Sequence, residues 1–278
     1  MHVTRRNSTP DRVPWPTAAI AVTGIAVFVA LPVAGLLWRV PWTDFFGIFG
    51  RAASLDALRV SMIASLSATA LSVLFGTPIA WQLSRISTRS RGVIRAAIVL
   101  PLVLPPVVGG IGLFYAFGRR GLVGQYLDDW FGIQIPYTIW ATIIAETFVA
   151  IPFYVVTVEG ALRGIDRRYV HAAASFGARP FTIMRRVVLP MIAPSVLAGA
   201  ALSWARALGE FGATITFAGN FQGRTQTLPL AIYLAFESDD AAGLVLGVAL
   251  MAVAFLVLAL VGSDVLTARA RERETAQA

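Results

Sequence analysis

Long stretches without any charged residue constrain this chain more than any other feature of its sequence. A helix needs about 20 consecutive apolar residues to cross the hydrocarbon core of a bilayer. Five uncharged stretches reach or approach this length, and a sixth contains only Glu146; they are residues 17–38, 60–84, 96–118, 130–158, 187–205 and 241–263. Only 14% of the residues are charged, against about 25% in a typical soluble domain. The sequence therefore predicts an all-α, polytopic membrane helix bundle with about six transmembrane helices.

The predicted spans divide the chain into one transmembrane domain and two short ends. The spans lie near residues 17–38, 58–84, 94–118, 137–158, 187–212 and 241–263. They form a domain over residues 17–264, between an N-terminal segment (1–16) and a C-terminal tail (265–278). The first span follows three arginines, as a signal peptide does, but its apolar stretch is too long for a signal sequence and five more spans follow. We interpret it as a retained helix.

The distribution of arginine predicts the orientation of the bundle. All 23 basic residues are arginine, and if the N-terminus lies inside, sixteen of them fall in inner segments and six in outer segments. Cytoplasmic loops carry the excess of basic residues. We therefore expect a multi-pass protein of the cell (inner or plasma) membrane, in contact with lipid, with both ends in the cytoplasm. The net charge of +8 is then loop charge, and no nucleic-acid partner is predicted.

Several classes of chemistry are excluded by residues that the sequence lacks. The chain has no cysteine and only two histidines, which excludes thiolate chemistry and a histidine-rich metal site. It contains no GxxxxGK[ST] phosphate loop and no serine in a nucleophile elbow. We expect no metal, no cofactor and no catalytic residues, so any energy for uphill transport must come from a separate subunit.

The inner connection over residues 159–186 carries the main functional signal. Asp166 can cap a short helix, Gly177 can end it, and Pro180 follows just beyond. A second short turn then leads into the next span. The pattern predicts a helix-turn-helix element at the membrane surface, with small residues and a fringe of arginines. Two interpretations remain open: an amphipathic helix that only anchors the loop, or a docking element for a cytoplasmic partner.

This connection resembles the cytoplasmic-loop signature of permeases of ABC importers. The family pattern reads Glu-Ala-Ala, three residues, Gly, nine residues, Ile, any residue, Leu-Pro, and His171 stands here in place of the glutamate. The residues that would form the coupling loop are His171, Ala172, Ala173, Ala174, Gly177, Ala178, Pro180, Leu189 and Pro190. The resemblance implies a type I importer fold in which this loop inserts into a cleft on a separate ATPase subunit.

A second stretch is similar to one branch of the same family. Residues 204–220, WARALGEFGATITFAGN, closely resemble the fifth helix of molybdate permeases, and sulfate permeases carry a related segment. The resemblance implies a homodimeric permease for molybdate that works with two ATPase subunits and an extracytoplasmic molybdate-binding protein. The alternatives are a permease of the same architecture for sulfate or tungstate, or a stand-alone secondary transporter. A membrane enzyme is a further class, for which no catalytic constellation is present.

Polar residues in the fifth span are candidates for the translocation pathway. Arg206 and Glu210 are four residues apart, so they share one helix face and can pair. A charge within a span costs several kcal/mol unless it is paired. The pair either orients the helix inside the bundle or contributes an attenuated positive charge to an anion path. The other candidates on this path are Glu146, Thr214, Thr216 and Asn220.

Prolines and glycines in the third span predict a kinked helix. The candidate kink or gate residues are Pro105, Pro106, Gly109 and Gly110. Such residues are tolerated at membrane depth where neighbours or a cavity satisfy the freed carbonyl groups. The alternatives are a gate or cavity lining, or the ordinary irregularity of membrane helices.

Overall fold

The computed structural model describes the backbone of residues 15–86 and 88–277 and the surroundings of the side chains of residues 23–86, 91–257 and 259. The predicted N-terminal segment, residues 1–16, thus lies outside the described residues up to residue 14, and residue 278 of the predicted tail lies outside as well. The elements are α1 (Trp15–Arg39), α2 (Phe45–Phe49), α3 (Ala52–Arg85), α4 (Thr88–Val103), α5 (Pro106–Phe117), α6 (Gly124–Phe131), α7 (Ile139–Gly164), α8 (Arg167–Ser175), α9 (Pro180–Ile183), a π-helical turn (Met184–Val188), α10 (Leu189–Leu208), α11 (Gly212–Phe217), α12 (Leu228–Ser238) and α13 (Asp240–Gln277).

Several of these helices are long and apolar enough to cross a membrane. Within the described residues, four single helices meet this condition: α3, α7, the continuous helix Pro180–Leu208, and the first part of α13 up to Val257. The pair α4–α5 makes a fifth span if its two bent halves are counted together. The first predicted span, residues 17–38, lies within α1. No strand occurs in the described part of the chain, and the prediction of an all-α membrane helix bundle is confirmed.

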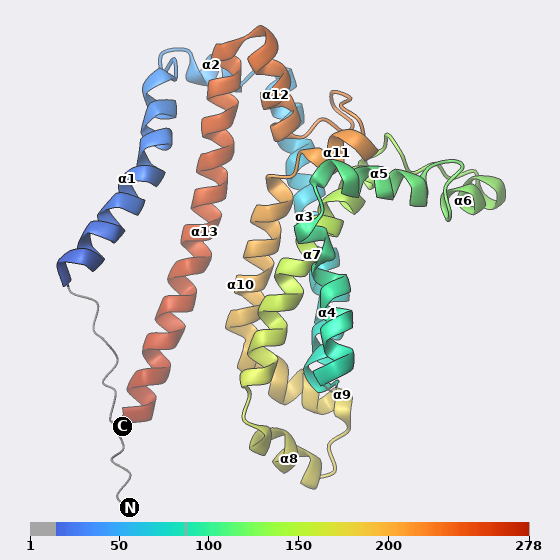
Figure 1. Ribbon diagram of the computed structural model, residues 1–278, viewed down its shortest axis with the longest axis vertical. Helices are drawn as coiled ribbons and strands as arrows, with labels where there is room; N and C mark the ends of the chain where they lie inside the picture. The colour runs from blue at the N-terminus through green and yellow to red at the C-terminus, as the bar shows by residue number, and fades with distance from the viewer. Residues whose placement is uncertain (1–14, 87, 278) are drawn as a thin grey trace, which may run out of the picture.

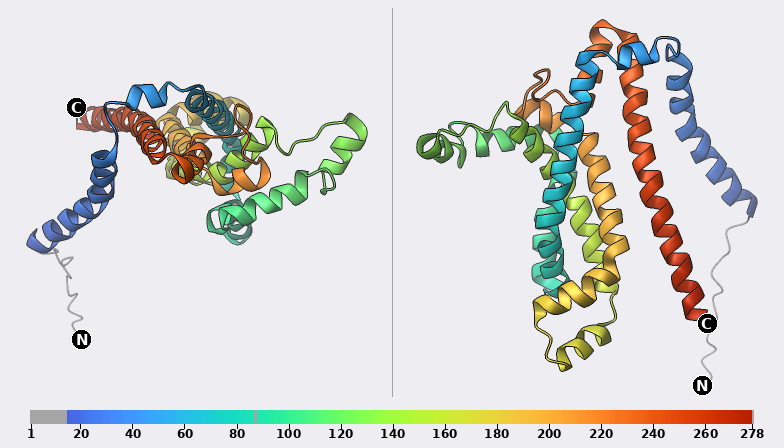
Figure 2. Two further views of the ribbon diagram at one scale, coloured as in Figure 1. Left: turned by 90° about the horizontal axis from the view of Figure 1, so that it is seen from above. Right: turned by 180° about the vertical axis from the view of Figure 1, so that it is seen from behind.

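Three helices form the centre of the bundle. α3, α7 and α10 pack against one another, and α4 packs on α7 (Figure 1). α13 packs on α10 and α12, and α1 contacts α13 at the side of the molecule. α6 extends away from the bundle on the side opposite α1 (Figure 2). The end that carries α8 and α9 is called the α8 end below, and the opposite end the α12 end.

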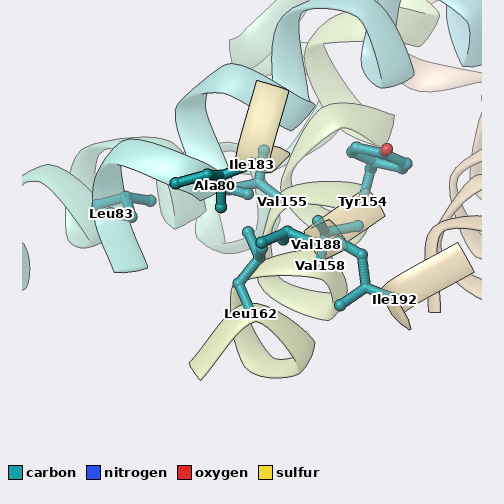
Figure 3. Packing of buried hydrophobic residues seen from close by; sticks show 9 residues of the cluster. All are labelled: Ala80, Leu83, Tyr154, Val155, Val158, Leu162, Ile183, Val188 and Ile192. Carbon is teal, nitrogen blue, oxygen red and sulfur yellow. The ribbon is translucent and has the colours of Figure 1, made fainter. Parts of the chain in front are cut away.

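The largest buried apolar cluster lies at the α8 end of the central helices. Figure 3 shows it as side chains from α3, α7 and the segment leading into α10. Its members are Ala80, Leu83, Tyr154, Val155, Val158, Leu162, Ile183, Val188 and Ile192. The cluster joins the start of α10 to the end of α7, so the helices on either side of α8 are packed into one unit.

Small residues allow α3, α7 and α10 to approach closely. The buried face of α3 is almost free of large side chains; it consists of Ser54, Ala57, Val60, Ser61, Ala64, Ser65, Ala68, Ser72, Gly76, Ala80 and Leu83. Tyr154 of α7 fills the space beside Gly76, and its hydroxyl lies 2.7 Å from Thr77 Oγ1. Ser203 of α10 donates a hydrogen bond to the Ala150 carbonyl of α7 at 3.2 Å. Small interfacial residues of this kind drive helix packing in membranes.

Replacing Gly76 with alanine is expected to destabilise the bundle. A Cβ atom at this position would lie 2.6 Å from Tyr154 Cδ1, and overpacking of this kind costs about 1–3 kcal/mol. Thermal unfolding of the purified protein measures the effect. Gly247→Ala in α13 is the matched control, because a Cβ atom there meets nothing within 4 Å. Equal unfolding temperatures for the two variants would contradict this prediction.

α7 continues beyond the apolar stretch from which its span was predicted. It ends at Gly164, so the first residues of the predicted 159–186 connection are helical. Glu159 is buried within α7, and its Oε2 atom pairs with Arg95 Nε of α4 at 3.6 Å. The ion pair offsets part of the cost of burying this charge, while Glu159 Oε1 has no hydrogen-bond partner among the described residues.

Candidate functional site

The fifth predicted span breaks at Gly209, and a carboxylate organises the break. α10 ends at Leu208 and α11 begins at Gly212. Glu210 lies between them and uses both carboxylate oxygens: Oε1 accepts a hydrogen bond from the Ala213 amide at 2.8 Å, and Oε2 pairs with Arg206 Nη2 at 2.6 Å. The Arg206 side chain is 28% exposed and that of Glu210 only 1%. Glu210 thus caps α11 and neutralises the arginine at the end of α10.

A second carboxylate, Glu146 of α7, lies near the Arg206–Glu210 pair. Glu146 is buried, and it is close enough to Glu210 for the two carboxyl groups to interact electrostatically. Its Oε2 atom has no hydrogen-bond partner among the described residues, and neither has the buried hydroxyl of Thr142 one helical turn away. Buried polar groups are normally hydrogen-bonded, so we expect these atoms to find their partners in water or in another molecule.

The neighbouring elements also carry buried polar atoms without a hydrogen-bond partner. Within the described residues, the Thr214 hydroxyl of α11 and the Asn220 side-chain oxygen are also buried without a partner. Trp204 Nε1 of α10 belongs to the same group. Since α11 packs on α7, Thr214, Glu146 and the Arg206–Glu210 pair belong to adjoining segments. We refer to Glu146, Arg206, Glu210 and Thr214 as the polar cluster.

Thr216 differs from the other pathway candidates. Its hydroxyl donates to the backbone of its own helix, with Gly212 O at 2.9 Å and Ala213 O at 3.2 Å. The side chain also lies beside Gly110 of α5. Thr216 therefore belongs to the contact between α11 and α5, and its single O–H donor is already used within α11.

The kink candidates lie where α5 meets α11. The axes of α4 and α5 differ by 112° across the break that contains Pro105, and Pro106 begins α5. Gly109 faces the ring of Phe148 on α7. A Cβ atom on Gly110 would lie 2.6 Å from the Ala213 carbonyl oxygen, so only glycine permits this approach. The bend and the polar cluster are therefore mechanically connected through α11.

Replacing Gly110 with alanine is expected to push α5 away from α11. The overlap with the Ala213 backbone cannot be relieved by rotating a side chain, and we expect a loss of about 1–3 kcal/mol in stability together with reduced transport. Gly112→Ala, two residues further along α5, meets nothing within 4 Å and serves as the control. Thermal unfolding and solute uptake of the two variants, measured side by side, check this; identical behaviour would contradict it.

The predicted coupling element forms a capped helix at the α8 end. The Asp166 side chain accepts a hydrogen bond from the Arg168 amide at 2.9 Å, as expected for an N-cap. At the other end Gly177 has φ +77°. Its amide donates to Ala174 O at 2.9 Å, and the Ala178 amide donates to Ala173 O at 3.2 Å. This is a Schellman motif, and it aligns α8 for the turn into α9 at Pro180.

Aromatic side chains of this element are directed away from the bundle. Phe176 is 92% exposed and Phe181 is 75% exposed. Ala172 and Ala174 are also exposed, whereas Ala173 and Ala178 pack partly against the core. His171 is exposed, while Leu189 and Pro190 lie at the start of α10. The element thus presents small residues and two phenylalanines on a surface that the described chain leaves uncovered.

Asp166→Ala is expected to loosen α8. The pKa of the Asp166 carboxyl is lowered mainly by the hydrogen bond from the Arg168 amide, and further by the hydrogen bond from the Arg168 guanidinium. A lowered pKa means that the cap persists above the ordinary pKa of aspartate and is lost as pH falls through the lowered value. We expect faster amide hydrogen exchange in the first turn of α8 for Asp166→Ala at neutral pH. Asp166→Asn, which retains a capping oxygen, should exchange like the native protein.

Some relevant residues were not identified from the sequence. Thr142 lies four residues before Glu146, so the helical period would have indicated it. Glu159 and Arg95 are far apart in the sequence, and no local pattern relates them. The same holds for Tyr154 and Thr77. These contacts depend on how α3, α4 and α7 pack together, which local spacing does not encode.

Comparison with known proteins identifies the family of this chain. Residues 72–272 match the family described as "Binding-protein-dependent transport system inner membrane component". The molybdenum transport system permease protein ModB of Mycobacterium tuberculosis is 47% identical over 243 residues, which cover 87% of this chain and 91% of that protein. ModB of Escherichia coli K12 is 35% identical, covering 77% and 95%. The sulfate transport system permease protein CysT of Salmonella typhimurium is 33% identical, covering 78% and 79%.

Solved structures show the same fold at lower identity. A chain of a bacterial ABC transporter involved in the import of the acidic polysaccharide alginate has a TM-score of 0.68 at 16% identity, covering 91% of this chain and 96% of that chain. The MetNI methionine ABC transporter, in inward-facing conformations, gives a TM-score of 0.53 at 20% identity, covering 76% and 95%. With the family match over most of the length, this chain belongs to the binding-protein-dependent transport system inner membrane components, the permease subunits of ABC transporters.

Proposed function

We propose that this chain is the membrane-spanning permease subunit of an ATP-driven importer of molybdate. The observation that carries the proposal is the 47% identity to a molybdenum permease along 87% of the chain. The segment 204–220, which resembles the fifth helix of molybdate permeases, contributes Arg206, Glu210 and Thr214 of the polar cluster. The resemblance therefore includes three of the four members of the polar cluster.

The energy for transport would come from two copies of a separate ATPase subunit. The sequence has no phosphate loop of its own. α8 and the residues after it support this assignment, because the small residues of α8 permit close approach and the exposed side chains of Phe176 and Phe181 offer apolar anchors. The ATPase would bind the surface formed by α8, Gly177 and α9.

The excess of arginine in the predicted inner segments supports an orientation with the α8 end and both termini in the cytoplasm. An extracytoplasmic molybdate-binding protein would then meet the α12 end. Two identical chains related by a two-fold axis would enclose the pathway, since symmetric pairs are the commonest assembly. The unpartnered atoms of Glu146 and Thr214 support a water-filled pathway beside the polar cluster.

Two helices link the docking surface to the polar cluster. α7 carries Glu146 and leads into α8, while α10 follows α9 and carries Arg206. The apolar cluster at the α8 end holds α7 and the start of α10 together. If the ATPase subunits move α8 as they close, α7 and α10 would therefore move as whole helices and shift the polar cluster. Rigid-body motions of this kind are a common form of switching.

Arg206 supplies the attraction for an anion, and Glu210 limits it. Their ion pair at 2.6 Å reduces the field that a dianion would meet. A site that binds too strongly does not release its ion. A partly neutralised arginine therefore suits a path through which an anion passes, and we assign this role to the Arg206–Glu210 pair.

Uptake of labelled molybdate into proteoliposomes tests the proposal. The vesicles contain this chain with its ATPase and binding protein, and Gly177→Asp serves as the coupling control. We expect uptake that needs ATP and all three components and that is lost in the variant. Uptake without the ATPase would instead identify a stand-alone transporter and refute the proposal.

Competition by other anions tests whether molybdate is the transported anion. The 33% identity to a sulfate permease makes sulfate the relevant competitor, and tungstate is the other. We expect excess sulfate to leave molybdate uptake unchanged. Strong inhibition by sulfate would retain the importer architecture and remove the molybdate assignment.

A further inference from the structure

A cavity of about 620 Å³ lies at the α8 end, apart from both the polar cluster and the exposed phenylalanines. It is bounded by the ends of α3 and α7, the start of α4, and α8. Four arginines from these four helices line it: Arg85, Arg91, Arg163 and Arg167. His171 of α8 and Trp81 of α3 complete its polar and aromatic lining.

Within the part of the chain that the structure describes, no negative charge balances the arginines of this cavity. No carboxylate of the described residues lines it. Among the ion pairs of the described residues, none includes any of the four arginines, because Glu159 pairs with Arg95 and Asp166 with Arg168. Four cations brought together from separate helices repel one another unless an anion lies between them.

Two details indicate a preformed site. The Arg85 guanidinium lies over the Trp81 ring, 3.8 Å from its centroid, a cation–π contact that restrains it. His171, which stands at the position where the permease pattern has glutamate, lines the cavity, so the lining has an imidazole in place of a carboxylate. The cavity is thus specifically poor in negative charge.

We propose that this cavity binds a tetrahedral oxyanion of the phosphate type. Guanidinium groups match such oxygens with paired hydrogen bonds. The anion has two physical sources: a free oxyanion, or the phosphate of an anionic phospholipid, since basic pockets between membrane helices bind lipid head groups. The cavity is larger than one oxyanion requires, so it accommodates either source. The inference goes beyond the proposed function and holds whichever anion is transported.

A bound anion would connect α8 to the rest of the bundle. Arg167 and His171 belong to α8, whereas Arg85, Arg91 and Arg163 belong to the helices above it. An oxyanion bridging the two groups would restrain the docking element. Occupancy should therefore slow amide hydrogen exchange in α8, a readout that does not require transport.

The test compares two double variants of the full-length chain purified with its ATPase subunit. Arg163→Gln with Arg167→Gln removes two cavity charges. Arg185→Gln with Arg186→Gln removes two exposed charges from the same region that do not line the cavity. Isothermal titration with molybdate, sulfate and phosphate measures free-oxyanion binding, and native mass spectrometry measures retained phosphatidylglycerol and cardiolipin. His171→Glu, which adds a carboxylate to the lining, is a third variant.

The expected result is a weakening of at least about tenfold, the size expected for losing one charged hydrogen bond, in the cavity variant and in His171→Glu but not in the control. If this is seen in titration, the source is a free oxyanion. If titration shows no cavity-dependent binding but phospholipid is retained by the native and control proteins and lost from the cavity variant, the source is lipid. If neither measurement separates the cavity variants from the control, the site does not exist and the proposal is overturned.

Discussion

Replacing Glu210 with glutamine is expected to reduce molybdate uptake at least about tenfold and to destabilise the protein by about 3 kcal/mol, the cost of breaking a buried ion pair by removing one partner. Glutamine retains an oxygen that can accept the hydrogen bond from the Ala213 amide, so the cap of α11 survives. The change therefore isolates the charge, and it leaves Arg206 without its ion-pair partner.

The double variant Arg206→Gln with Glu210→Gln separates the two roles that the sequence left open. If the pair only orients α10, removing both charges should restore stability and uptake together. We expect stability to recover while uptake stays low, because Arg206 provides the attraction for the anion.

Arg119→Gln is the control for losing one member of an ion pair. Arg119 pairs at 2.7 Å with Asp128 of α6, and exposed ion pairs of this kind contribute little to stability. Native stability and uptake in Glu210→Gln would contradict this account.

The membrane architecture could be predicted because its signal is local. An uncharged stretch long enough to cross a bilayer has few alternatives to a helix. The span predicted near 58–84 lies within α3, and the span predicted near 137–158 lies within α7 except for its first two residues. α8 was also predictable, since an N-cap at Asp166 and an αL glycine at Gly177 are short-range signals.

The sequence was less informative where backbone geometry depends on distant contacts. Pro105 and its neighbours predicted a kink in the third span, but the 112° angle depends on the packing of α5 against α11. Similarly, Glu159 reads as a loop charge in the sequence, but in the structure it is buried within α7 and pairs with Arg95 of another helix. Each of these features requires knowledge of which helices are neighbours.

In the candidate site, too, local features could be predicted from the sequence and features that depend on helix packing could not. The Arg206–Glu210 pair follows from the helical period, and the structure forms it. The nearness of Glu146 to Glu210 joins α7 to the α10–α11 break and has no local signal. The cavity arginines come from four helices, so the sequence shows them only as loop charges that set orientation. Sequence spacing therefore identifies the members of a site on one helix and misses those that packing adds.

Replacing Phe176 with serine is expected to weaken binding of the ATPase subunit strongly while leaving the permease itself folded. The Phe176 ring is 92% exposed in this chain, so its removal should change the stability of the permease by no more than about 0.5 kcal/mol. Aromatic side chains that become buried in an interface contribute about 2 kcal/mol or more, which corresponds to a loss of about 30-fold in affinity.

This variant distinguishes a docking element from a membrane-surface anchor. An anchoring helix would use Phe176 to contact lipid, and its loss would then weaken the membrane contact of α8 without changing ATPase affinity. A docking element predicts the reverse, because the ATPase would cover the ring. Tyr126→Ser on α6, at the opposite end of the bundle, is the control: it also removes an exposed aromatic ring and should retain native ATPase affinity. Co-purification and binding titrations with the ATPase subunit measure the difference. Native affinity in Phe176→Ser would exclude this ring from the interface and favour the anchoring role, since nothing in the described chain otherwise requires an exposed phenylalanine at the end of α8.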